Sequence, residues 1–109
     1  MTLADELEMA RIETAAKFPA LEVVVQDGSV YVNFGFSEAV VITPEIVPSG
    51  RMWIAEALAW DRTHGASAEQ EIFGDVNLTA VLHRVDYFLR QQLENERKLQ
   101  ELLDSRPED

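Results

Sequence analysis

The chain has 109 residues, of which 47% are hydrophobic, and this size and composition are typical of one globular domain with one core. Twenty Asp and Glu against nine Lys and Arg give a formal net charge of −11, which disfavours direct binding to a nucleic-acid backbone. The absence of cysteine excludes disulfides, thiolate metal sites and cysteine nucleophiles. No secretion signal or membrane anchor is readable, so we expect one soluble, cytoplasmic domain over residues 1–109 that does not bind membranes.

The first predicted element is an α-helix over residues 3–17. This segment contains no Gly or Pro and is rich in Ala, Glu, Leu and Met, which have high helix propensity. Asp5 and Glu6 lie in the first turn, where carboxylates stabilise the positive end of the helix dipole. Pro19 is expected to end the helix because it lacks a backbone donor.

The next segment predicts a β-hairpin, because Asp27-Gly28 is typical of a two-residue type I′ turn between strands. Counting outward from the turn pairs Val25 with Val30 and Val24 with Tyr31. The alternation then produces one apolar face, formed by Leu21, Val23, Val25, Val30, Val32 and Phe34. The second face is mixed, and its apolar residues Val24 and Tyr31 are candidates for contact with a partner.

A third strand is expected over residues 39–43, ending at Pro44, so that the sheet is a three-stranded antiparallel meander. Thr43-Pro44-Glu45 can also be interpreted as the start of a helical turn with Pro in the first helical position.

Residues 51–63 predict a second main helix, because nearly every residue in this segment is apolar and a helix buried on several sides has that pattern. Trp53 and Trp60 would then belong to the core. Gly65 would end this helix, and Ser67 with Gln70 three residues later resembles a capping box that opens a short helical turn.

The last predicted element is a long amphipathic helix over residues 78–103. Its apolar seam runs through Leu78, Leu82, Val85 and Leu89. Beyond Leu93 the seam weakens, so we expect a compact core over about residues 3–93 and, over residues 94–109, a projecting helix end and frayed tail. Three leucines in that end are further contact candidates, and they are Leu99, Leu102 and Leu103.

The sequence predicts no catalytic, cofactor-binding or metal-binding residues. His64 and His83 lie on different elements without the spacing of a metal-binding motif, and we interpret them as capping and surface residues. No glycine-rich phosphate loop or nucleophile elbow is present. Carboxylate pairs such as Glu69 with Glu71, or Glu94 with Glu96, lie in polar segments and are expected to be solvated.

The predicted order of elements resembles two small bacterial families at the level of topology. The passage from residues 30–33 to residues 40–44 resembles that of nucleoid-associated proteins of the YbaB type, although the charge of this chain contradicts their DNA binding. The size, acidity and first helix are similar to those of small acidic secretion chaperones. Those chaperones have further strands before their last helix, which the sequence does not predict here.

The sequence therefore predicts an α+β fold and leaves three functions open. The first is a non-enzymatic, homodimeric protein-interaction module that acts as an adaptor, chaperone or inhibitor of a basic protein partner. The second is an inhibitor that mimics nucleic acid and blocks a DNA- or RNA-binding protein, in antidefence or regulation. The third is a small enzyme that uses a carboxylate cleft.

Overall fold

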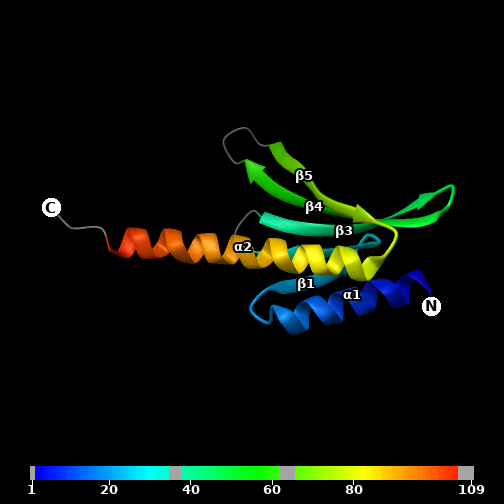
Figure 1. Cartoon of the computed structure of the whole chain (residues 1–109), viewed down its shortest axis with the longest axis horizontal. Helices are drawn as coiled ribbons and strands as arrows, with labels where there is room; N and C mark the ends of the chain where they lie inside the picture. Colours follow the sequence, from blue (N-terminus) through cyan, green and yellow to red (C-terminus); the bar gives the residue numbers. More distant parts are fainter. Residues whose placement is uncertain (1, 35–37, 62–65, 106–109) are drawn as a thin grey trace.

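The computed structural model describes residues 2–34, 38–61 and 66–105, with side chains described outside 59–61 and 66–70. In chain order, one helix precedes five strands and a second helix follows them. The elements are α1 (Leu3–Lys17), β1 (Glu22–Gln26), β2 (Ser29–Asn33), β3 (Glu38–Val47), β4 (Gly50–Asp61), β5 (Ala66–Asp75) and α2 (Leu78–Asp104). The strands form one antiparallel sheet in the order β1-β2-β3-β4-β5, and both helices lie on the same side of it (Figure 1). The predicted α+β class is confirmed, but the predicted three strands are wrong because the sheet has five.

The helix α1 begins at a capping box, in which the Thr2 hydroxyl accepts from the Asp5 amide and the Asp5 carboxylate accepts from the Thr2 amide. Its bounds agree with the prediction. Leu7 and Ala10 are buried against the sheet, and α1 covers the β1 and β2 side of that sheet.

The hairpin of β1 and β2 has the predicted turn and register. Asp27 and Gly28 adopt φ angles of 52° and 76°, which is the left-handed region that a type I′ turn requires. Val24 pairs with Tyr31 and Val25 with Val30, as the count from the turn predicts. Leu21 lies outside β1, although it packs against the core.

The third strand is twice as long as predicted, and Pro44 lies inside it rather than at its end. Pro44 pairs with Trp53 of β4, whereas the pairing of β3 with β2 ends at Ile42. This position past the end of β2 tolerates a residue that cannot donate a backbone hydrogen bond. The alternative helical start at Pro44 is also wrong.

The predicted second helix over residues 51–63 is wrong, since its described part is strand β4. Its residues form a ladder with β3 from Gly50 to Ala59, and Pro48-Ser49 is the two-residue connection. Ala and Leu have high helix propensity, but ten cross-strand pairs on one side and the pairing with β5 on the other override it. The sequence pattern of an apolar run that is covered on two sides is compatible with either a buried helix or a buried strand.

The predicted capping box at Ser67 and Gln70 is also wrong, because β5 continues from Ala66 to Asp75. A β-bulge opposite Ala55 and Glu56 leaves Ile72 as an extra residue, and both Ile72 and Phe73 pack against the core. Gly65 and His64 fall outside the described residues. With β4 and β5, further strands do precede the last helix, so the expectation that such strands are absent is wrong.

The core lies between the two helices and one face of the sheet. From the sheet it contains Val30, Val32, Val40, Ile42, Trp53 and Ala55, and from α2 it contains Leu78, Val81, Leu82, Val85 and Leu89. Phe34 meets Phe88 of α2 edge-to-face, with ring centroids 6.3 Å apart. Trp53 is a core residue as expected, though it belongs to a strand; the side chain of Trp60 lies outside the described part.

The second half of α2 extends beyond the sheet and gives the molecule extents of 61 × 32 × 20 Å (Figure 1). Every residue from Asn95 to Ser105 is exposed. We call residues 94–104 the projecting segment; the predicted frayed tail beyond Ser105 lies outside the described residues. Neither described helix combines the length and apolar character that a membrane crossing requires.

Candidate protein-interaction surfaces

No helix of the described residues covers the face of the sheet opposite α1 and α2, and we call this face the open face. Successive side chains of a strand point to opposite faces of the sheet, so the residues that alternate with the core residues lie on the open face. Its apolar members are Val24, Tyr31, Val41, Met52, Ile54 and Leu58. Val41 is only 8% exposed yet does not belong to the core cluster, because the side chains beside it on the open face surround it.

Carboxylates are interspersed with these apolar residues. Cross-strand pairing aligns Val24, Tyr31 and Val41 in one row, which continues into Glu56 and Glu71. Glu56 and Glu71 stand directly opposite each other on β4 and β5, and like charges in that position destabilise a sheet. The open face therefore holds a like-charged pair beside an apolar stripe.

The described Lys and Arg residues all lie away from the open face. Six of them belong to the helices, and Arg51 of β4 points to the helix side, where it donates to Glu6 of α1 at 2.6 Å. Two pairs of polar side chains on the open face form hydrogen bonds. Asn33 donates to Glu22 at 2.9 Å, and the hydroxyls of Ser29 and Thr43 are 3.0 Å apart. Among the described residues, Glu56 and Glu71 thus have no cation on their own face.

The projecting segment is the second candidate surface. Leu99, Leu102 and Leu103 are 58%, 68% and 51% exposed. Arg97 bridges Glu94 and Glu101 along the helix, and these pairs stabilise the segment without any contact with the sheet.

Two exposed ion pairs along the helices shift the acidities of their carboxyls. The hydrogen bond from Arg97 lowers the pKa of Glu94 and raises that of Arg97, with the charge of each group acting in the same direction. Arg11 lowers the pKa of Glu8 on α1 by the same cause. Both carboxylates are solvent-exposed, so these pairs act on local helix stability rather than on any reacting group.

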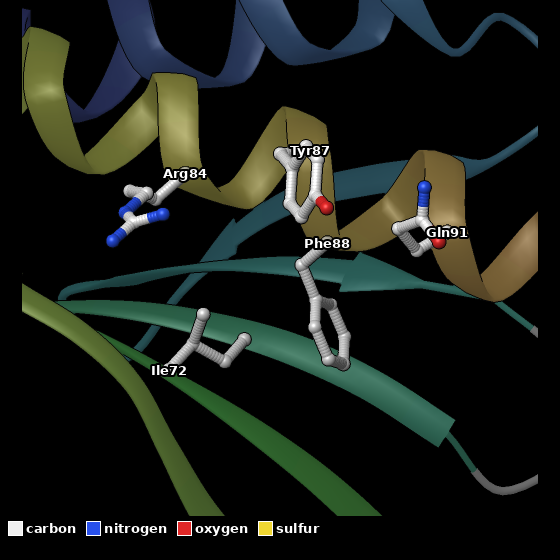
Figure 2. Close-up of a pocket in the computed structure, with 5 residues that line it drawn as sticks. All are labelled: Ile72, Arg84, Tyr87, Phe88 and Gln91. Carbon is white, nitrogen blue, oxygen red and sulfur yellow. The ribbon is translucent and has the colours of Figure 1, made fainter.

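A cleft between β5 and α2 forms the third candidate surface. It has a volume of about 250 Å³ and is lined by Ile72, Arg84, Tyr87, Phe88 and Gln91. Figure 2 shows the Phe88 ring descending from α2 toward the strands, with Ile72 directed upward from β5. Arg84 stacks over Phe73 with its guanidinium 5.1 Å from the ring centroid, so its charge borders an apolar cleft.

The structure places the five predicted contact residues on two separate surfaces. Val24 and Tyr31 form a half-buried pair on the open face, whereas the three leucines lie on the projecting segment. The sequence prediction missed the larger part of the open face, namely Met52, Ile54 and Leu58, because it assigned them to a helix. The available signal was Pro48-Ser49-Gly50, a turn sequence followed by a run compatible with alternation.

No group of three or more potential metal ligands occurs among the described residues. His83 is an exposed residue of α2, and His64 lies outside the described part. Within that part, no cleft brings together the carboxylates that an acid-base mechanism would use.

Comparisons with protein-family models, with curated proteins and with solved structures find no match to this chain.

Proposed function

We propose that this chain is a non-enzymatic acidic protein-interaction module whose open face binds a basic and apolar segment of a partner protein. It would thereby act as an adaptor, chaperone or inhibitor of that partner. The observation that carries the proposal is that both helices cover the same face of the sheet, which leaves an apolar stripe on the other face in contact with water.

The apolar content of the open face supports a protein ligand. An antiparallel sheet with one solvated face normally alternates apolar residues inward and polar residues outward. Here Tyr31, Val41 and Ile54 face outward at the middle of the sheet. Contiguous apolar surface rimmed by polar residues is characteristic of protein-binding sites.

Charge favours a basic partner over a second copy of this chain on the open face. A Lys or Arg brought between Glu56 and Glu71 would relieve the repulsion between two carboxylates that stand opposite each other. A second copy would instead add its own acidic face to the first.

Nucleic-acid mimicry has less support from the same surface. A mimic of a phosphate backbone needs a row of acids, whereas Glu22, Glu45 and Glu56 are separated by apolar side chains on the open face. The interleaving fits an extended segment in which every second residue is alternately basic and apolar, because residues two apart in an extended chain point to the same side.

We also propose that the module acts as a homodimer. The support for this part is the projecting segment, where Leu99, Leu102 and Leu103 have no described contact with the sheet. Helix associations bury such residues against a partner.

The partner proposal is tested with a synthetic peptide of the repeat Lys-Ser-Val-Ser, which presents Lys and Val on the same side of an extended chain, beside a peptide of the repeat Glu-Ser-Val-Ser. We expect the basic peptide to bind, with NMR shift changes centred on Tyr31 and Val41. The substitutions Glu56→Lys/Glu71→Lys should weaken its binding about tenfold or more. The control Glu13→Lys/Glu96→Lys changes net charge equally but lies on the helices and should retain binding.

Equal weakening in both double variants would show that net charge alone attracts the peptide, and it would overturn the open face as the site. Equal binding of the acidic peptide would overturn the basic partner.

A further inference from the structure

The cleft over β5 and two of the exposed leucines, Leu99 and Leu102, lie on one side of α2, but they are far apart along it. Phe88 and Leu102 are separated by 14 residues, which is about 21 Å of helix at 1.5 Å per residue. The helix is continuous from Leu78 to Asp104, so the leucines of one chain cannot reach the cleft of the same chain.

The two features belong to a single stripe of the helix surface. Steps of four and three residues connect Arg84, Phe88, Gln91, Asn95, Lys98 and Leu102, and this spacing keeps side chains on one face. A hollow lined by Lys98, Glu101, Leu102 and Ser105 continues the same side beyond the cleft. This stripe is distinct from the buried seam through Val85 and Leu89.

We propose that two copies of this chain pack antiparallel along this stripe, so that Leu99 and Leu102 of each projecting segment fill the cleft of the other copy. The proposal rests on homodimerisation as part of the proposed function. A two-fold axis beside Asn95 brings two pairs level at once: Phe88 with Leu102, and Gln91 with Leu99. Each cleft then receives apolar side chains from the second copy.

The symmetry of this arrangement makes it closed and self-complementary. A two-fold contact uses the same patch on both chains and stops at two copies. The polar Asn95 lies at the axis and faces its own counterpart, and a buried Asn in a helix seam specifies register. In this register Lys98 comes within about 3 Å, measured along the axis, of Glu94 of the second copy, so the flanking charges are opposite.

The volume of the cleft suits this occupant. About 250 Å³ accommodates one or two aliphatic side chains, and Ile72 and Phe88 provide apolar walls for them. The open face of each copy stays free for the basic partner, because the stripe belongs to α2, which lies on the other side of the sheet (Figure 1).

The first test is the mass in solution, by sedimentation over a range of concentrations. Wild type is expected at twice the 12.3 kDa of one chain. Leu99→Glu/Leu102→Glu should raise the dissociation constant about 100-fold or more, since each substitution removes a buried leucine from both halves of the interface. The matched control Ile46→Glu/Val76→Glu replaces two apolar residues that are 92% and 67% exposed outside the stripe, and it should remain dimeric.

The second test locates the axis, using the fact that the chain contains no cysteine. Asn95→Cys should form a disulfide-linked dimer on mild oxidation, because the residue faces its own counterpart. Gln100→Cys, exposed on the opposite side of the same helix, should not.

A wild-type mass of one subunit at all concentrations would overturn both homodimerisation and this interface, while leaving the peptide-binding test of the open face unaffected. A dimer that persists in Leu99→Glu/Leu102→Glu, or that links through Gln100→Cys and not through Asn95→Cys, would overturn this interface alone.

Discussion

The two halves of α2 belong to one unbroken helix but are stabilised by different means. From Leu78 to Leu89 the helix presents five buried residues to the sheet, so its apolar face is packed there. From Asn95 to Asp104 every residue is exposed, and the described interactions are pairs within the helix such as Arg97 with Glu94 and Glu101. Isolated helices of about 12 residues are marginal in water, so the projecting segment depends on its continuity with the packed half.

The largest difference between the halves is expected from truncating a leucine in each. Leu89→Ala should lower the free energy of unfolding by about 2–5 kcal/mol, because Leu89 is fully buried and its removal leaves a cavity. Leu99→Ala should change it by about 0.5 kcal/mol or less. Both are measured by urea denaturation in a Leu102→Glu background, where dimerisation does not contribute. Similar costs for the two would show that the projecting segment packs against its own domain.

A smaller effect is expected at the helix ends. Asn77 caps α2 by accepting from the Thr79 amide at 2.9 Å, and Asn77→Ala should cost about 1 kcal/mol. Ser105 at the other end follows the projecting segment, so Ser105→Ala should cost about 0.5 kcal/mol or less. Thermal denaturation measures both, and an equal loss at the two ends would contradict the division of the helix.

The smallest effect is a pH dependence confined to the projecting segment. Because the pKa of Glu94 is lowered in the helix from its ordinary value of 4.5, the pair with Arg97 stabilises the helix above that value. The stabilisation is lost as the pH falls through the lowered pKa. Backbone carbon shifts of residues 94–104 should therefore report less helix at acid pH, and Glu94→Gln should reduce this dependence. A loss of helix that is as large in Glu94→Gln as in wild type would rule out the pair as its cause.

Short-range sequence patterns predicted the residues of some elements correctly. The Asp27-Gly28 turn requires positive φ angles, which determines the register of β1 with β2, and the four-three spacing from Leu78 to Leu89 predicts the packed face of α2. Two of the candidate surfaces were therefore predicted in part, through Val24 and Tyr31 and through the three leucines.

The β4 strand could not be predicted in the same way. Its apolar run, from Met52 to Leu58, satisfies the pattern of a buried helix as well as that of a buried strand, and its alanines favour helix. This segment is a strand because it pairs with β3 and β5, and a short stretch of sequence does not reveal those pairings. Missing β4 meant missing both Ile54 on the open face and the Glu56–Glu71 pair, and missing β5 meant missing the cleft at Ile72.

The sequence by itself determined the acidity of the chain, the first hairpin and the amphipathic last helix, because composition, turn geometry and short-range periodicity do not depend on contacts between distant segments. Only the tertiary structure decided that five strands form the sheet and that both helices cover the same face of it. That arrangement depends on hydrogen bonds and packing between segments far apart in the chain. It is also what leaves one apolar, acidic face uncovered and extends a row of leucines away from the core.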